Sequence, residues 1–270
     1  MNALELRGAG LSYGSRTLWS GLDLTVEPGE FIAVLGANGS GKTSLLRAIL
    51  GLQPLTHGSV LVAGQPPRKA SRAIGYVPQH RRLDPITPLR GKDVVRLGLD
   101  GHRWGPGWLR GDDRQRISAA LEEVDATSFA EAPVGELSGG EQQRVRIAQA
   151  VASDPAVLLC DEPLLTLDLA SQRTITSLID RRRRARQTAV LFVTHEINPV
   201  LPYVDRVLYL AGGQFRVGPV DEVLTSATLS TLYGAEIEVV RSGDRILVAG
   251  LPEQPEHAHD HCIEPEGPLG

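Results

Sequence analysis

The segment GANGSGKT at residues 36–43 constrains this 270-residue chain more than any other part of it. It follows the apolar run FIAVL at 31–35 and precedes a helical pattern at 44–50, so the order is strand, glycine-rich turn, helix. Glycines let backbone amides turn inward around a phosphate, and the helix N-terminus adds positive potential. The sequence therefore predicts a phosphate-binding loop. The alternative, a turn without a ligand, explains the glycines but not the adjacent Lys42 and Thr43.

The composition makes the lysine of this loop informative, because only three of the 28 basic residues are lysines. Lys42 is expected to reach the β- and γ-phosphates of a nucleotide, and the Thr43 hydroxyl to bind Mg²⁺. The ATP-binding residues predicted in this segment are Gly36, Ala37, Asn38, Gly39, Ser40, Gly41, Lys42, Thr43 and Ser44.

Two further apolar runs, at 156–160 and 189–193, predict strands that are buried on both faces of a parallel sheet. Ligands bind beyond the carboxyl ends of such strands, so the phosphate loop, the acids after 160 and the histidine after 193 are expected to share one cleft. The loosely alternating residues 4–26 predict an antiparallel β-lobe, and 80–136 reads as inserted helices. The fold class predicted is α/β: a P-loop nucleotide-binding core with a mostly parallel sheet, an antiparallel β-lobe and an inserted helical subdomain.

The rest of the chain divides into a domain and a tail. Glycines at 212 and 213 predict a hairpin, followed by short helices near 221–225 and 229–233 and a strand pair about 242–244. We assign 1–250 to one domain, with the helical insert at about 80–150. Residues 251–270 are rich in His and Pro, with too few apolar residues to offset the entropy of ordering, so we predict a disordered tail.

Composition excludes several classes of protein. The net charge of −4 gives no general reason to bind nucleic acid. No apolar run approaches the ~20 residues that span a bilayer, and the start of the chain lacks a signal-peptide pattern, so we expect a cytosolic chain. Cys160 and Cys262 form no disulfide framework, and Cys160 reads as a core residue. The arginines at 181–184 and 186 read as a solvated helix face, with contact to anionic lipid headgroups or a partner as the alternative.

The segment LSGGEQQR at 137–144 opens another helix. Ser138 and Glu141 form the pattern of a capping box, and the same helix start is also an anion site. This segment resembles the signature motif of ATP-binding cassette (ABC) ATPases. The resemblance implies that Ser138, Gly139, Gly140 and Glu141 contact the ATP held by the opposite subunit of a dimer.

Other segments resemble motifs of the same family. VLLCDEP at 157–163 is similar to the Walker B strand, which implies that Asp161 supports Mg²⁺ and that Glu162 activates the attacking water. The resemblance further implies that Gln79 contacts Mg²⁺ and water and that His195 senses the γ-phosphate.

Two more family positions match. Tyr13 resembles the aromatic residue that stacks on adenine, and Asp168 in LLTLD resembles the D-loop aspartate. Leucines around Thr166 depart from the small hydroxylated residue that is usual two or three places before this aspartate.

The resemblance implies a homodimer that sandwiches ATP and works with separate transmembrane permease subunits, peripherally on the cytoplasmic side of the membrane. In an importer, an extracytoplasmic metal-binding protein would act indirectly. The alternatives are a soluble ABC ATPase outside transport, for which tandem cassettes or a long coiled-coil insertion would be expected, an exporter subunit, and a transporter of another substrate.

For the substrate, the region from 204 to 241 is similar to the ATPases of zinc and manganese importers. The tail adds His257, His259, His261 and Cys262, which suit Zn²⁺ better than Mn²⁺. The sequence thus favours zinc, with manganese next, and a secondary zinc site in the tail.

Overall fold

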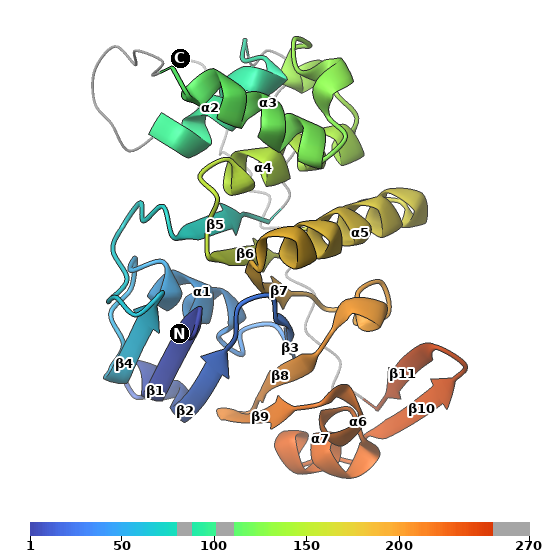
Figure 1. The fold of residues 1–270 in the computed structure, drawn as a ribbon. Helices are drawn as coiled ribbons and strands as arrows, with labels where there is room; N and C mark the ends of the chain where they lie inside the picture. The colour runs from blue at the N-terminus through green and yellow to red at the C-terminus, as the bar shows by residue number, and fades with distance from the viewer. Residues whose placement is uncertain (80–87, 101–110, 251–270) are drawn as a thin grey trace, which may run out of the picture.

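A six-stranded sheet forms the centre of the computed structural model, which describes residues 1–79, 88–100 and 111–250 (Figure 1). Neighbouring strands are parallel except for the last pair, β8 and β9. The predicted α/β class with a mostly parallel sheet is therefore confirmed. In sheet order the strands are β5 (Ile74–Val77), β6 (Val157–Asp161), β7 (Ala189–Val193), β3 (Phe31–Gly36), β8 (Arg206–Ala211) and β9 (Gln214–Gly218).

The apolar runs form the middle of this sheet because both of their faces are buried. Along β3, Phe31 and Ala33 pack into the core beneath the helices, whereas Ile32 and Val34 pack into a second core against the β-lobe and α1 (Lys42–Ile49). Cys160 in β6 is fully buried, as predicted for a core residue. Because these strands carry apolar side chains on both faces, polar side chains that could bind a ligand lie only at the ends of the strands.

The antiparallel β-lobe packs beside the central sheet (Figure 1). It consists of β1 (Leu4–Tyr13), β2 (Arg16–Val26) and β4 (His57–Val62), in the order β2-β1-β4. The lobe predicted from residues 4–26 is confirmed. The sequence analysis did not identify β4 or β5, because six- and four-residue strands with glycine in them give little alternation to detect.

The described part of the chain between β5 and β6 contains several helices, which gather at one end of the molecule (Figure 1). They are α2 (Gly91–Asp100), α3 (Asp113–Glu123) and α4 (Gly139–Val151), with single-turn helices at Thr127–Phe129 and Val134–Glu136. The predicted helical insert is present, and it contains α2, a helix that was not predicted individually. The long helix α5 (Leu169–Arg186) connects β6 to β7 and lies between these helices and the rest of the sheet.

The region after β9 also follows the predicted order. It contains α6 (Val220–Val223), α7 (Ser226–Tyr233) and the strand pair β10 (Glu238–Ser242) and β11 (Arg245–Ala249); a single-turn helix, Leu201–Tyr203, precedes β8. The four predicted tail ligands lie outside the described residues. Within the part that the structure describes, no helix is both long and apolar enough to cross a bilayer.

The arginine run at the end of α5 differs from its prediction. Arg182 and Arg183 are buried, with 7% of each residue exposed, so a solvated face is wrong for these two. Arg182 pairs with Glu123 and Asp154, which tie α5 to the helical insert.

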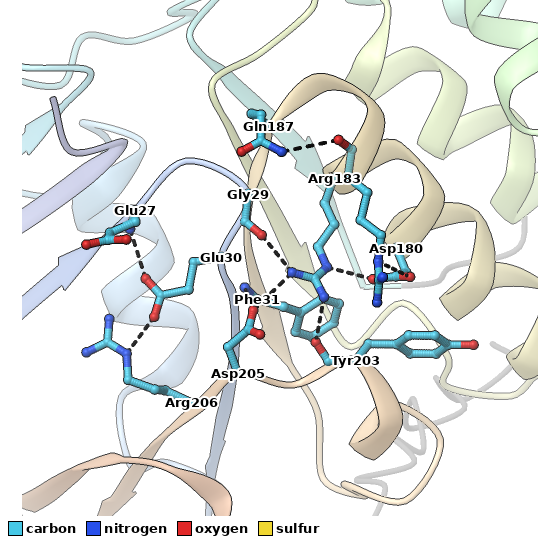
Figure 2. A network of polar contacts seen from close by, with 11 residues as sticks. Glu27, Gly29, Glu30, Phe31, Asp180, Arg183, Gln187, Tyr203, Asp205 and Arg206 are labelled. Carbon is cyan, nitrogen blue, oxygen red and sulfur yellow. Dashed lines mark hydrogen bonds and ion pairs between the residues drawn. The ribbon is translucent and has the colours of Figure 1, made fainter.

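Arg183 points away from the helical insert and binds residues at the amino ends of β3 and β8 (Figure 2). Its guanidinium donates to Asp180, to Asp205 and to the Gly29 and Tyr203 carbonyls, and it lies 5.8 Å from the centre of the Phe31 ring. This network, which we call the Arg183 network, fixes the edge of the sheet that is remote from the phosphate loop.

Candidate nucleotide site

The phosphate loop joins β3 to α1 and holds its lysine inside the protein. Lys42 is 6% exposed, and its ammonium donates to the Gly36 carbonyl over 2.7 Å and to the Ala37 carbonyl over 3.0 Å. Burial lowers the pKa of Lys42, while Glu162 and Asp161 act in the opposite direction. The lysine is thus positioned over the loop, with two carboxylates nearby.

At two positions of the loop, Gly36 and Gly41, no residue with a side chain would fit. A Cβ atom on Gly36, where φ is 141°, would lie 2.0 Å from the Leu210 carbonyl oxygen, and one on Gly41, where φ is 97°, would lie 2.8 Å from Trp19 Nε1. Both the left-handed backbone and the close approach require glycine. The loop conformation is therefore specified by neighbours in β2 and β8 as well as by its own sequence.

A cavity of about 360 Å³ opens beside the loop. Tyr13 is at its mouth, 49% exposed, and its hydroxyl donates to Gln53 Oε1 over 2.6 Å. Arg16 and Leu18 also line the cavity, and Arg16 donates to the Gly39 carbonyl over 3.2 Å. The sequence analysis missed both, and their only signal is closeness to Tyr13. The lining residues are Tyr13, Arg16, Leu18, Asn38, Gly39, Gly41, Lys42, Thr43, Ser44 and Glu162.

The ends of β5, β6 and β7 bring three of the predicted residues together at Glu162. Gln79 Nε2 donates to Glu162 Oε2 over 3.1 Å, and His195 Nε2 lies against Glu162 Oε1. The His195 contact, followed by smaller effects, holds the pKa of Glu162 below its usual value despite partial burial. Because Glu162 also lines the cavity, the expectation of one shared cleft at the strand ends agrees with the geometry.

Glu162 is also in a strained backbone conformation, with φ at 49°. Left-handed geometry in a residue with a large side chain is uncommon and costs about 1 kcal/mol or more. The Glu162 amide donates to the Val193 carbonyl at the end of β7, which helps to hold this conformation. In this conformation the carboxylate contacts both Gln79 and His195.

Asp161, the preceding residue, has a different environment. It is 5% exposed and accepts a hydrogen bond from the Tyr76 hydroxyl over 3.2 Å. Burial raises the pKa of Asp161, and burial beside this carboxylate raises the pKa of Tyr76 to about 12. Tyr76 was not identified from the sequence, because this contact crosses from β5 to β6.

Thr43, Asp161 and Gln79 offer the hard oxygen ligands that suit Mg²⁺. The Thr43 hydroxyl is close enough to Asp161 to hydrogen bond with it and lower its pKa, in opposition to burial. These residues fit the ion. The described ranges contain no group of three or more His, Cys, Asp or Glu residues that could hold a metal by themselves.

The LSGGEQQR segment occupies a separate hollow. Ser138 caps α4 in a capping box, in which its backbone amide donates to Glu141 Oε2 over 2.8 Å. The Ser138 hydroxyl is the main cause that lowers the pKa of Glu141. A cavity of about 250 Å³ beside this cap shares no lining residue with the nucleotide cavity: it is lined by Ser138, Gly140, Glu141, Arg144, Ala170, Ser171, Thr174 and Ile175.

Asp168 has a structural role in the same region. Its carboxylate caps α5 by accepting the Ala170 and Ser171 amides, each over 2.9 Å, and the Ser171 hydroxyl over 2.7 Å. Hydrogen bonds from Ser171 lower the pKa of Asp168. The residue predicted for the D-loop therefore begins α5 beside the Ser138 hollow.

A buried lysine in the glycine-rich loop after β3, with adjacent acids at the end of β6 and β7 between the two strands, defines the class of P-loop nucleoside triphosphatases. The ABC transporter family model matches residues 19–165, more than half of the chain. The chain therefore belongs to the ABC transporter family, as an ATP-binding subunit that hydrolyses ATP.

Several relatives have names that state a substrate. The zinc import ATP-binding protein ZnuC of Pseudomonas fluorescens is 38% identical over 210 residues, 77% of this chain and 74% of that protein. The manganese transport system ATP-binding protein MntB of Halalkalibacterium halodurans is 34% identical over 226 residues, 83% and 89% of the two chains. The aliphatic sulfonates import ATP-binding protein SsuB 1 of Pseudomonas fluorescens is 40% identical over 212 residues, 78% and 74% of the two chains.

Two solved structures share the fold. A putative metal-chelate type ABC transporter in an inward-facing conformation matches with a TM-score of 0.77 and 28% identity, over 92% of this chain and 96% of that one. A dimeric ATP-binding cassette in a post-hydrolysis state with ADP and Pi matches with a TM-score of 0.66 and 28% identity, over 80% of this chain and 98% of that one.

Proposed function

We propose that this ATPase energises a membrane importer of a divalent transition metal, with zinc favoured and manganese next. The observation that carries the proposal is the pair of relatives named for zinc and manganese import, at 38% and 34% identity. The solved transporter of putative metal-chelate type points the same way.

A transporter of a different substrate is the competing proposal, since the sulfonate-import relative is 40% identical. The two cavities described above are lined by residues suited to a nucleotide and its phosphates, so they do not distinguish one transported substrate from another. The decision therefore requires a test of the substrate itself.

The proposed roles of the residues around the nucleotide cavity are those that the family resemblance implies, and the geometry is compatible with them. Lys42 binds the β- and γ-phosphates, Tyr13 stacks on adenine, and Glu162 activates the attacking water. The position of Glu162 supports this role, because its carboxylate lines the cavity and contacts Gln79 and His195. Gln79 and His195 orient Glu162; Gln79 contacts Mg²⁺ and the attacking water, and His195 contacts the γ-phosphate.

Mg²⁺ would be held by Thr43, Asp161 and Gln79, and when bound it would neutralise charge on the phosphates. The burial of Asp161 supports the assignment, since a buried carboxylate with a raised pKa gains much from a nearby cation.

The separation of the two cavities supports a head-to-tail dimer. The Ser138 hollow and the Lys42 cavity share no lining residue, so one chain offers two half-sites. In a twofold dimer, Ser138, Gly139, Gly140 and Glu141 would meet the partner's ATP, with Asp168 beside them. We place this dimer on the cytoplasmic side of the membrane, with its helical subdomain against separate permease subunits and an extracytoplasmic metal-binding protein beyond them.

The tail carries a separate, secondary proposal. His257, His259, His261 and Cys262 would bind Zn²⁺ weakly, because ordering a segment with so few apolar residues costs entropy. Deletion of the chain after residue 251 should leave ATP hydrolysis in place and change only its response to added Zn²⁺. An unchanged response would remove the tail from the proposal.

Growth under metal chelation tests the transported substrate. A strain without this gene should be rescued by added zinc, and a strain that expresses the Glu162→Gln variant should behave like the deletion. Rescue by manganese alone would replace zinc with manganese. A strain with no metal phenotype that fails to grow on sulfonates as its sulfur source would support the competing substrate.

A further inference from the structure

We infer that Asn198 is a positioning residue for ATP hydrolysis, because it clamps the C-terminal hairpin β10–β11 to the loop that carries His195. The inference rests on the role proposed above for His195. Asn198 follows His195 by three residues, and its side chain bonds to a residue that is 48 positions further along the chain.

The clamp is a two-point contact. Asn198 Nδ2 donates to the Ile246 carbonyl over 3.0 Å, and Asn198 Oδ1 accepts from the Ile246 amide over 2.8 Å. One side-chain amide thus satisfies both backbone groups of a residue in β11, as a neighbouring strand would. A contact of this kind fixes the orientation of the Asn198 side chain as well as its distance from β11.

The buried residues of the hairpin and of the His195 loop lie next to this contact. Ile246 is 4% exposed and is the buried residue of β11, and Ile197, next to Asn198, is 6% exposed in the same core. The remaining residues of β10 and β11 are exposed or half-buried. A two-stranded hairpin is marginally stable by itself in water, so its position depends on such attachments.

The loop around His195 needs anchors, because packing does not hold its tip. The His195 side chain is 40% exposed, and the loop has no regular secondary structure. Before His195, the Thr194 amide donates to the Val34 carbonyl at the end of β3, and the Thr194 hydroxyl forms a turn with Glu196. Asn198 supplies the anchor on the other side of His195.

The position of His195 matters because its Nε2 must lie against Glu162 Oε1. A shift of about 1 Å at a catalytic contact can reduce a rate by about 100-fold. Nucleotide binding depends on other elements, since the residues that line the cavity come from β1, β2, the phosphate loop, α1 and the end of β6. Loss of the clamp should therefore lower kcat and leave KM for ATP unchanged.

The hairpin has a second attachment that provides a matched control. Arg241 in β10 pairs with Asp221 of α6 over 2.8 Å, on exposed side chains. Arg241→Ala loosens the hairpin without touching the His195 loop. If hairpin stability alone mattered, this variant and Asn198→Ala would behave alike.

The experiment measures steady-state ATPase activity of the full chain for Asn198→Ala, Asn198→Asp and Arg241→Ala, beside thermal unfolding. Asp has the shape of Asn and still accepts from the Ile246 amide, but it places a carboxylate oxygen against the Ile246 carbonyl, so it breaks half of the clamp and provides a second test if the alanine variant fails to fold. We expect kcat to fall about tenfold for both Asn198 variants, with KM unchanged, and to stay at the wild-type value for Arg241→Ala. A wild-type kcat for the Asn198 variants, or an equal loss for Arg241→Ala, would overturn the inference.

A double variant shows whether Asn198 acts through His195. In single-turnover assays with excess protein, Asn198→Ala should cause no further loss in a His195→Ala background, because the group it positions is gone. A further tenfold loss would mean that Asn198 acts by another route. If His195→Ala alone hydrolyses ATP at the wild-type rate, the role of His195 fails first and the inference falls with it.

Discussion

The two edges of the central sheet use charged side chains in opposite ways. At the amino edge, Arg183 is surrounded by the partners of its network, and Glu30 beside it accepts from Arg206 over 2.5 Å (Figure 2). At the carboxyl edge, Lys42 is buried against carbonyls, and Glu162 is held in a left-handed conformation.

The difference follows from what each edge must bind. Charges of the amino edge meet one another within the chain, so their contribution is to stability. Those of the carboxyl edge line a cavity and have raised or lowered pKa values, which is typical of sites that handle a ligand or a proton. Matched substitutions at the two edges should therefore separate activity from stability.

The largest expected effect is on hydrolysis by Glu162→Gln. Loss of the carboxylate should slow hydrolysis by roughly 10²–10⁴-fold, because general-base catalysis contributes about that much, while ATP binding remains. Size-exclusion chromatography should then show an ATP-dependent dimer. The control is Glu30→Gln at the amino edge, which should hydrolyse ATP normally and lose about 1 kcal/mol of stability. A Glu162→Gln variant with wild-type turnover would show that Glu162 has another role.

The next effect separates ligand affinity from folding. Lys42→Ala should weaken ATP binding by roughly 10–100-fold, because hydrogen bonds from a cation to the phosphates are lost. Arg183→Ala should instead lower the free energy of unfolding by about 3 kcal/mol, because it removes a buried side chain that pairs with Asp180 and Asp205 and donates to two backbone carbonyls. Calorimetric titration with ATP, corrected for the folded fraction, and chemical unfolding measure the two. An unchanged ATP affinity of Lys42→Ala would argue against the phosphate loop.

Ser138 lies at neither edge, and its variant tests whether a second chain completes the site. Ser138→Arg should reduce hydrolysis about 100-fold, as loss of a transition-state donor does, yet leave ATP binding by one chain nearly intact. A heterodimer of this variant with a Lys42→Ala chain keeps one composite site intact and damages the other twice. Two equally impaired sites in the heterodimer would contradict action across the dimer.

The sequence predicts a residue's place in the fold best where that place is determined by its near neighbours. The phosphate loop, the acids after 160 and His195 each follow an apolar strand directly, so strand prediction also placed the chemistry. The tyrosine that bonds Asp161 was missed, since Tyr76 is 85 residues away in sequence and only sheet pairing brings the two together.

The arginine run at 181–186 also shows that contacts distant in sequence cannot be predicted from the local pattern. Five arginines within six positions look alike in sequence, so their pattern does not reveal that Arg182 and Arg183 turn inward. Their acidic partners Glu123, Asp154 and Asp205 are 22 to 59 residues away, and the topology decides which arginine meets them. The run therefore read as a solvated face until the fold was known.

The smallest expected effect concerns stability at the carboxyl edge, where two adjacent carboxyls should respond in opposite directions. Burial raises the pKa of Asp161, so its ionised form destabilises the fold at pH values above that pKa, and the penalty fades as the pH falls through it. The pKa of Glu162 is lowered, mainly by His195, so its ionised form stabilises the fold above its ordinary pKa, and this gain is lost as the pH falls through the lowered value.

Replacing each carboxyl by its neutral isostere should shift the melting temperature in opposite directions. Asp161→Asn keeps an acceptor for Tyr76 and removes the buried charge, so at pH 7.5 in EDTA it should raise Tm by about 2 °C, an advantage that shrinks toward acidic pH, while hydrolysis is lost. Glu162→Gln should lower Tm at the same pH. Thermal unfolding of both variants and the wild type between about pH 5 and pH 8 provides the comparison. If Asp161→Asn melts below the wild type throughout, the contacts of Asp161 with Lys42, Thr43 and Tyr76 outweigh its burial. The carboxyl edge would then be built for stability much as the amino edge is.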